Sequence, residues 1–122
     1  MTEISGNQLR GHLEALVLAV LEAGETHGFD LLKRLQQQGE GAFALKEGTI
    51  YPVLYRLEQS GMVSARWEDD NSDRRGPRRR LYKLTRKGQR TLTTARDQWS
   101  QFVSVMGRFL DPRPGTALQF ST

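Results

Sequence analysis

Apolar residues in the first half of the chain recur every three or four positions, which is the spacing of one buried face of an α-helix. This spacing predicts helices over residues 8–23, 27–38 and 46–60. Gly24 ends the first helix, and Thr26 caps the second. The side chains expected to face the core are, helix by helix, Leu9, Leu13, Leu16, Val17, Val20 and Leu21; Phe29, Leu32 and Leu35; and Ile50, Val53, Leu54 and Leu57.

Pro52 lies inside the third predicted helix, where a proline removes one backbone donor. We expect the helix to tolerate it, because the amides of a first turn have no acceptor within the helix. This requires the helix to begin between Lys46 and Gly48. Gly61 is the predicted end of the helix.

After the third helix the helical spacing gives way to alternation, the pattern of a β-strand with one buried face. Residues 62–68 and 79–85 are the two strands that this pattern predicts. One side of the first strand carries Val63, Ala65 and Trp67. Three helices followed by a two-stranded hairpin is the order of a winged helix-turn-helix domain. We therefore predict a mainly α (α+β) fold with this domain over residues 1–85.

A heptad pattern in the last third of the chain predicts one long helix over residues 86–110. Its apolar stripe extends past a small domain, so a second copy of the chain is its simplest partner. The alternative is that the stripe folds back onto the core of its own chain. Residues 111–122, with two prolines and a glycine, are expected to form a flexible tail. The predicted dimer contacts are Leu92, Ala95, Trp99, Phe102, Met106 and Phe109, and Val103 and Leu110 widen the stripe.

Positive charge is concentrated in residues 74–90, which hold nine of the eighteen Lys and Arg residues and no acid. The net charge of +4 is moderate, so it is the focusing of charge on one element that points to nucleic acid. Arginines on a short hairpin suit a narrow negative groove or a row of phosphates. The alternative is a solvated charged loop. The hairpin residues predicted to contact DNA are Arg74, Arg75, Arg78, Arg79 and Arg80.

Polar and aromatic residues interrupt the apolar stripe of the third helix and can face outward. They supply a hydroxyl, two phenols and a guanidinium, which are groups that bind phosphates or base edges. Each has an ordinary alternative: Thr49 stabilises the helix start, the tyrosines are half-buried, and Arg56 pairs with Glu58 or Asp30. The residues predicted to contact DNA from this helix are Thr49, Tyr51, Tyr55 and Arg56, with Lys46 at its start.

The sequence carries no recognisable catalytic set, so neither enzyme activity nor a cofactor is expected. There is no cysteine, and His12 and His27 are expected to pack or cap helices rather than act as bases. Asp69, Asp70 and Asp73 would form a poor cage for a cation, so no metal site is predicted. No apolar run is long enough to cross a bilayer and no secretion signal is visible, so we expect a cytoplasmic protein.

Three segments together resemble the PadR family of bacterial transcription regulators. Residues 47–63 match the specific pattern Thr-aliphatic-Tyr-Pro-x-Leu-x-Arg-Leu-Glu-x-x-Gly followed by an aliphatic pair. Residues 27–32 (His-Gly-Phe-Asp-Leu-Leu) resemble the motif of the second helix. Residues 76–88 resemble the wing, the return strand and the Thr-x-x-Gly entry to the last helix. The match covers residues 8–110, and the short C-terminal helix resembles a smaller subgroup with multidrug-binding members, which carry a tryptophan at the position of Trp99.

The resemblance implies a dimeric repressor whose third helices enter successive major grooves of a pseudo-palindrome in double-stranded DNA. The wings would lie along the flanking minor groove or backbone. Two facing Trp99 side chains, with Val103 beside them, could also sandwich a planar aromatic effector, and the resemblance points the same way. Arg96 stands where a second aromatic is expected; it would favour anionic aromatics or simply fill the pocket. Alternatively, Trp99 is ordinary dimer core.

Two other functions remain open from the residues alone. A winged-helix module could present its arginines to an acidic protein partner instead. DNA binding would differ from this by weakening steeply with salt and by favouring an operator over random duplex. RNA binding is disfavoured, because no predicted strand presents the paired aromatics that stack on splayed bases.

Overall fold

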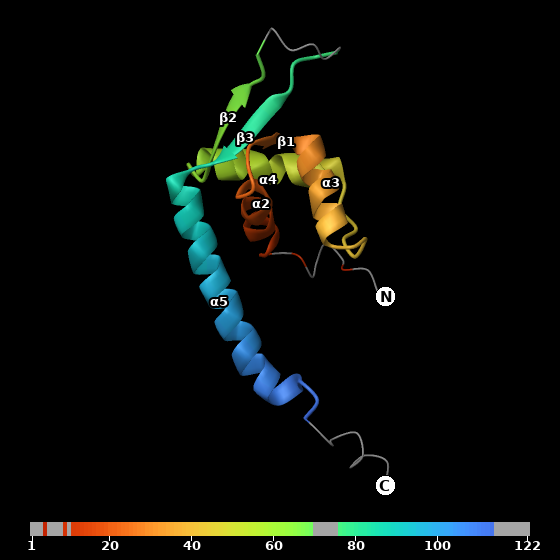
Figure 1. Cartoon of the computed structure of the whole chain (residues 1–122), viewed down its shortest axis with the longest axis vertical. Helices are drawn as coiled ribbons and strands as arrows, with labels where there is room; N and C mark the ends of the chain where they lie inside the picture. The colour runs from red at the N-terminus through yellow and green to blue at the C-terminus, as the bar shows by residue number, and fades with distance from the viewer. Residues whose placement is uncertain (1–3, 5–8, 10, 70–75, 114–122) are drawn as a thin grey trace. The chain divides into compact units, whose positions relative to one another are not determined.

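The computed structural model describes residues 4, 9, 11–69 and 76–113 of the chain. The chain divides into two compact units, residues 1–92 and 93–122. Figure 1 shows the first unit as a group of short helices beside a small sheet. None of the helices in the described segments is long and apolar enough to cross a membrane.

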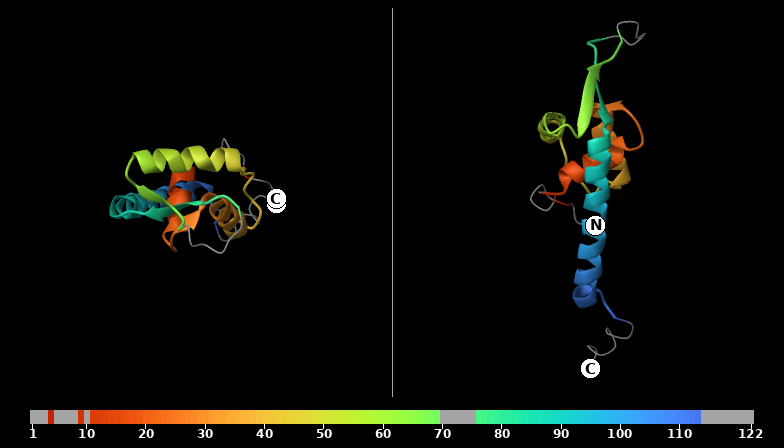
Figure 2. Two further views of the ribbon diagram at one scale, coloured as in Figure 1. Left: turned by 90° about the horizontal axis from the view of Figure 1, so that it is seen from above. Right: turned by 90° about the vertical axis from the view of Figure 1, so that its left-hand side faces the viewer.

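The helical part of the first unit consists of α2 (Leu13–Leu21), α3 (Gly28–Gln38) and α4 (Glu47–Gln59). Helices α2 and α3 pack against each other, and α4 lies across both (Figure 2). Helix α2 is shorter than the predicted 8–23. Gly11 has a φ of +87°, a left-handed conformation that interrupts a right-handed helix, and α2 begins only after it.

The start of α3 differs from the prediction, because His27 caps the helix and Thr26 does not. The Nδ1 atom of His27 lies 3.3 Å from the backbone nitrogen of Asp30 and can accept its hydrogen bond. Thr26 instead donates its hydroxyl to the Asp30 carboxylate at 2.7 Å. Asp30 thus has two contacts at the start of α3, one through its carboxylate and one through its backbone amide.

The buried face of α3 is also shifted from the predicted one. Phe29, expected in the core, is 59% exposed. Gly28, Leu31, Leu32 and Leu35 are the residues that the helix buries. These four follow the i, i+3, i+4, i+7 spacing of one helix face, and Phe29 falls one position outside it.

Helix α4 agrees closely with the prediction, and all its predicted inward side chains are buried. The expected reason for tolerating Pro52 is wrong, however, because Pro52 is the sixth residue of the helix and lies beyond the first turn. Its missing amide deprives the Gly48 carbonyl of the usual partner within the helix. Both residues are exposed, so water can hydrogen-bond to that carbonyl.

The sheet is three-stranded and antiparallel, in the order β1 (Thr26–His27), β3 (Arg80–Leu84), β2 (Val63–Trp67). Strands β2 and β3 form the predicted hairpin, whose register places Trp67 opposite Arg80. Strand β1 is absent from the prediction, because two residues cannot show alternation. Val63 is buried, whereas Trp67 on the same side of β2 is 53% exposed, because the end of the hairpin that carries it projects away from the helices (Figure 1).

The hydrophobic core of the first unit lies between the three helices and the sheet, and the first turns of the last helix close it. Leu92, which was predicted to contact a second copy of the chain, is 2% exposed and belongs to this core. Its prediction as a dimer contact is therefore corrected. The buried apolar side chains are Leu9, Val17, Leu18, Val20, Leu21, Leu31, Leu32, Leu35, Leu45, Ile50, Val53, Leu54, Leu57, Val63, Tyr82 and Leu92.

Helix α5 spans Arg86–Leu110, which are the predicted bounds. Thr85 precedes it, and its hydroxyl accepts from the Gly88 amide at 3.0 Å while donating to the Gly61 carbonyl at 2.7 Å. A Cβ atom at Gly88 would overlap the carbonyl oxygen of Met62. The Thr-x-x-Gly pattern thus joins the first turn of α5 to the chain segment between α4 and β2.

Candidate nucleic-acid interface

The outer face of α4 carries the residues that the sequence singled out for DNA contact. Lys46, Thr49, Tyr51, Tyr55 and Arg56 are all exposed. Tyr51 is 44% and Tyr55 63% exposed, so Tyr51 is about half-buried, as the alternative expected, and both side chains still reach the surface. The apolar residues of α4 occupy the opposite face and anchor it to the core. The helix therefore presents a hydroxyl, two phenols, an ammonium and a guanidinium to a ligand.

Tyr51 is positioned by a close approach to α3. A Cβ atom at Gly28 would lie 2.6 Å from the Cε1 atom of Tyr51 and 2.9 Å from its hydroxyl oxygen. A larger residue at this point would force the Tyr51 ring to move. The His-Gly-Phe segment at the start of α3 thus sets the position of one aromatic side chain on α4.

A shallow groove of about 660 Å³ separates the outer face of α4 from the hairpin. We call it the helix–hairpin groove. A second depression, of about 490 Å³, shares Tyr51, Arg80 and Tyr82 with it and reaches Phe29 and Trp67. The residues that line the helix–hairpin groove are Tyr51, Pro52, Tyr55, Arg56, Glu58, Gln59, Arg80 and Tyr82.

Several of the arginines are paired with carboxylates of the same chain. Less positive charge is therefore available to a ligand than the sequence suggests. Arg56 pairs with Glu14 on α2 at 3.2 Å, which corrects the expected alternatives, Glu58 and Asp30. Arg66 of β2 makes two hydrogen bonds to Glu25, at 2.7 and 3.0 Å. Further pairs are Arg79 with Glu68 at 3.3 Å, Arg80 with Glu58 at 2.9 Å, Arg66 with Asp69 at 3.8 Å and, within α3, Arg34 with Asp30 at 2.8 Å.

Arg79 joins the hairpin to the start of α3. Its Nη1 atom lies 2.8 Å from Nε2 of His27, and because an arginine only donates, that nitrogen must accept. The neutral ring then carries its proton on Nδ1 and cannot also accept from the Asp30 amide. The two hydrogen bonds of His27 are therefore alternatives: the ring accepts either from the Asp30 amide or from Arg79.

Arg80 lies at the centre of the interface, because it lines both depressions. Its Nη2 atom donates to Glu58 of α4 at 2.9 Å. Its guanidinium carbon lies 5.3 Å from the ring centroid of Trp67, its opposite residue on β2. One planar side chain thus contacts both the helix and the hairpin.

The pKa values near the interface follow these contacts. Hydrogen bonding to Arg66 lowers the pKa of Glu25, and the same contact raises the pKa of Arg66. The Thr26 hydroxyl, with Arg34 adding to it, lowers the pKa of Asp30 against the opposing effect of burial. Burial raises the pKa of the Tyr82 phenol. The carboxylates of Glu25 and Asp30 therefore stay ionised at neutral pH.

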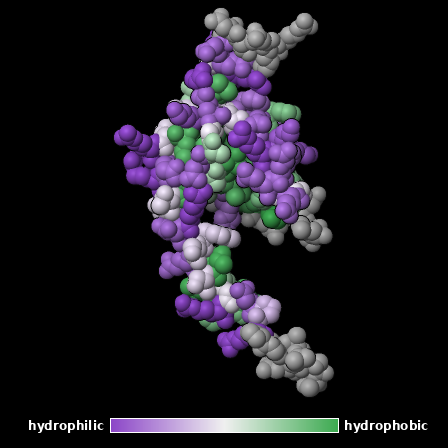
Figure 3. Space-filling view, viewed as in Figure 1, coloured by the Kyte–Doolittle hydropathy of each residue, from purple (hydrophilic) through white to green (hydrophobic). Residues whose placement is uncertain are grey.

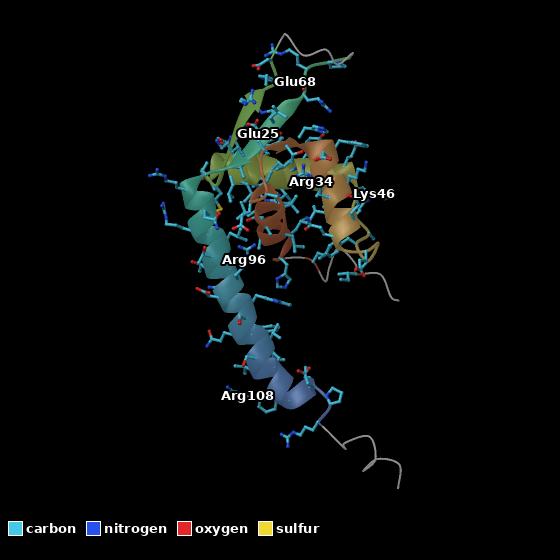
Figure 4. The ribbon with its side chains drawn as sticks, in the orientation of Figure 1. Glu25, Arg34, Lys46, Glu68, Arg96 and Arg108 are labelled. Carbon is cyan, nitrogen blue, oxygen red and sulfur yellow. The ribbon has the colours of Figure 1, made fainter. Side chains whose placement is uncertain are left out.

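The loop of the hairpin is described only in part. Arg78 is exposed and donates to the backbone carbonyl of Glu68 at 3.0 Å. Arg74 and Arg75, both predicted to contact DNA, lie outside the described residues, as do Asp70 and Asp73. Figure 4 labels Glu68 toward the far end of the hairpin and Glu25 beside the sheet. Among the described residues, no group of three or more His, Cys, Asp or Glu could hold a metal ion.

The second unit contains the residues predicted to form the dimer and the ligand site, except Leu92. The rings of Trp99 and Phe102 stack at a centroid distance of 6.1 Å. Trp99 is 55% exposed, Phe102 56% and Phe109 80%, and Figure 3 shows apolar patches between the polar residues along α5. Val103 and Met106 are exposed as well, as is Arg96, whereas Ala95 is intermediate.

Sequence reasoning missed the carboxylates that pair with the predicted DNA-contacting arginines. Glu58 lies 22 positions from Arg80, and Glu14 lies 42 positions from Arg56. Such pairs have no local spacing signal, unlike partners one helical turn apart. The sequence suggests Glu58 only as a partner of Arg56, two positions away on the same helix.

The comparisons with known proteins agree with the fold. A crystal structure of a PadR family transcription regulator from Clostridium difficile R20291 is 30% identical, covers 82% of this chain and 99% of that one, and has a TM-score of 0.73. Transcriptional regulator YqjI of Escherichia coli is 27% identical over 88 residues, which are 72% of this chain and 39% of that protein. Bacillus subtilis PadR in complex with operator DNA has a TM-score of 0.59 at 24% identity, over 67% of this chain and 45% of that one.

The family model for the transcriptional regulator PadR-like family matches residues 17–94. These residues run from α2 through the sheet to the start of α5 and include the whole of α4. The match therefore covers the helices and the hairpin that form the candidate interface. Because it spans more than half of the chain, this protein belongs to the PadR-like family of transcriptional regulators.

Proposed function

We propose that this regulator is a repressor that binds a pseudo-palindromic operator in double-stranded DNA as a homodimer. The observation that carries the proposal is the outer face of α4, where Thr49, Tyr51, Tyr55 and Arg56 are exposed beside an arginine-bearing hairpin. A helix of this kind fits the major groove, and the hairpin then faces the flanking backbone or minor groove. Its family consists of transcription regulators, so we do not expect enzyme activity.

The fold of a solved relative supports the same use of these elements. The structure of Bacillus subtilis PadR contains operator DNA, and its fold is similar to that of this chain. In this proposal the DNA contacts come from Lys46 and the outward residues of α4, together with Arg78 and the hairpin arginines on either side of it. The hairpin would supply affinity, and α4 would supply base preference.

The homodimer would form through the apolar face of α5. Trp99, Phe102, Met106 and Phe109 are between 38% and 80% exposed in the single chain. Side chains of this size are usually buried, and their contiguous exposure on one helix marks an interface. A two-fold partner would also set the spacing between two α4 helices, which a palindromic operator requires.

An aromatic effector would bind between the two Trp99 side chains of this dimer. The indole is exposed in one chain and stacks on Phe102, so each chain offers an aromatic surface. Titrating planar aromatic compounds, both cationic and anionic, should quench the fluorescence of Trp99 and release bound DNA. Trp99→Ala should abolish both effects, whereas Trp67→Phe should leave the quenching of Trp99 intact. Quenching without any change in DNA binding would contradict the ligand-gated role.

The operator-binding proposal is tested by selecting duplexes from a random pool with the full-length protein. We expect enrichment of an inverted repeat, with a dissociation constant at least about 1,000-fold below that for a shuffled duplex. The affinity should fall steeply as salt rises, because each phosphate contact releases counterions. If no sequence is enriched and binding is insensitive to salt, the alternative function applies, in which the winged helix contacts an acidic protein.

A further inference from the structure

Arg80 is the residue at which the hairpin meets α4. It is the first residue of β3, and its guanidinium both stacks near Trp67 and donates to the Glu58 carboxylate at 2.9 Å. The side chains of Arg80 and Glu58 are 33% and 28% exposed. The pair is therefore more shielded from water than Arg56 and Glu14, whose side chains are 58% and 49% exposed.

The position of Glu58 makes this contact different from the other ion pairs near the groove. Glu58 belongs to α4, the same helix that carries Tyr51, Tyr55 and Arg56 on its outer face. Arg66 and Arg79 pair instead with Glu25 and Glu68, which lie outside α4. Within the described part of the chain, the pair of Arg80 with Glu58 thus links the hairpin directly to the helix proposed to read DNA.

We propose that Glu58 and Arg80 are positioning residues that set where the hairpin stands relative to α4, and that operator selectivity depends on this pair. The inference rests on the proposed DNA-binding function and revises one part of it. Arg80 serves as the link between the two DNA-contacting elements, and its charge is committed to a carboxylate rather than to a phosphate.

The physical reason is the geometry of the guanidinium. It is planar and rigid, so contacts with a carboxylate and an aromatic ring fix its orientation as well as its distance. Trp67 is opposite Arg80 on the neighbouring strand, so the plane that contacts Glu58 is also braced by the hairpin. DNA must touch helix and hairpin at once, and a hairpin that shifts against α4 loses the register between their contacts.

The experiment compares single variants with a charge swap, using the duplex that the wild-type protein selects from a random pool and a shuffled duplex of the same composition. The measured quantity is the ratio of the two dissociation constants. Glu58→Gln and Arg80→Gln should each reduce this ratio about 10-fold, and the swap Glu58→Arg with Arg80→Glu should restore it to within about 3-fold of wild type. The ratio cancels the general change in attraction between protein and phosphates.

The swap separates positioning from phosphate binding. A glutamate at position 80 cannot bind a phosphate, so a swap that stays as unselective as Arg80→Gln would overturn the proposal and make Arg80 a DNA ligand. Unchanged ratios in both single variants would overturn it as well. Glu25→Gln is the matched control, because it breaks the Arg66 pair in the same unit without touching α4, and its ratio should stay at the wild-type value.

A readout without DNA checks the contact itself. The indole N–H resonance of Trp67, assigned with Trp67→Phe, should shift in Glu58→Gln because Arg80 loses the carboxylate that holds it near the ring. Glu25→Gln should leave this resonance where it is. An unmoved resonance in Glu58→Gln would show that Glu58 does not position Arg80. A wild-type protein that selects no duplex would instead contradict the proposed function, which is a different outcome from unchanged ratios among the variants.

Discussion

Close contacts at two glycines limit how near the elements of the first unit can approach one another. The Tyr51 ring fills the space beside Gly28, and the Met62 carbonyl fills the space beside Gly88. The second contact is the stricter one, because a backbone carbonyl cannot rotate away as a side chain can. Gly88 is also buried and receives the Thr85 cap, so its position is fixed from two sides.

Gly88→Ala should lower the free energy of unfolding by about 2–3 kcal/mol, because the new methyl group forces α5 away from Met62. The matched control is Gly48→Ala, which adds a methyl group to a helical glycine with nothing within 4 Å. That change should be neutral or stabilising by up to about 1 kcal/mol. Urea denaturation of the two variants measures both values, and equal effects would contradict the close approach at Gly88.

Asp30 should make stability depend on pH. Its folded pKa is lowered, first by the Thr26 hydroxyl and then by Arg34, so its contribution is present above the unfolded pKa of about 4 and is lost as the pH falls through the folded value. Asp30→Asn should therefore be less stable than wild type at pH 7, and the difference should shrink below pH 4. Urea midpoints from pH 2 to 7 test this.

At the scale of elements, α4 and the hairpin divide the proposed interface between them. Helix α4 turns one face to the core and the other to the helix–hairpin groove, so its outward side chains are held on a rigid support. The hairpin is tied to the helices by side-chain pairs, with Arg79 reaching His27 and Arg80 reaching Glu58. Substitutions in the two elements should therefore have different signatures.

Arg78→Ala in the hairpin loop should weaken binding to selected and shuffled duplexes alike. It should also reduce the salt slope by about one unit, because it removes one proposed phosphate contact.

Arg56→Ala on α4 should cost about 1–3 kcal/mol of binding free energy on the selected duplex and relax base preference at one position of each half-site. Fluorescence anisotropy at several salt concentrations separates the two. Equal losses on both duplexes for Arg56→Ala would assign its guanidinium to the phosphates.

At the scale of the whole molecule, the two units differ in how far their apolar side chains are buried. The first unit has a complete core, which takes in Leu92 of α5. Beyond that point the described part of α5 keeps its large apolar side chains exposed. We therefore expect the first unit to provide the stable folded core and the second unit to provide the contacts with another copy of the chain.

The full-length protein should therefore sediment as a dimer at micromolar concentration. Phe102→Glu places a charge on the exposed apolar face and should raise the dimer dissociation constant at least about 100-fold, because the change occurs in both copies. Ser104→Glu lies on the far side of the helix and should leave the dimer intact. Sedimentation velocity over a concentration series measures both. A monomeric wild type, or dimers that persist in Phe102→Glu, would contradict the proposed interface.

Several features of this protein follow from the sequence without any long-range information. The bounds of α5 and the buried face of α4 follow from repeats of seven and of three to four residues, because each helix must turn one apolar stripe inward. The hairpin follows from alternation in the same way. The outward residues of α4 are then simply those that the apolar stripe leaves over.

The contacts between these elements, by contrast, were decided only by the tertiary structure. Strand β1 exists because residues 26–27 meet β3, and α3 turns Gly28 and Leu31 inward rather than Phe29. The partners of Arg56 and Arg80 come from distant parts of the chain, so no local pattern shows them. Leu92 continues the heptad of α5 but packs into its own core. The reason is physical: periodicity reports which face of an element is apolar, whereas its partner depends on what the fold brings opposite that face.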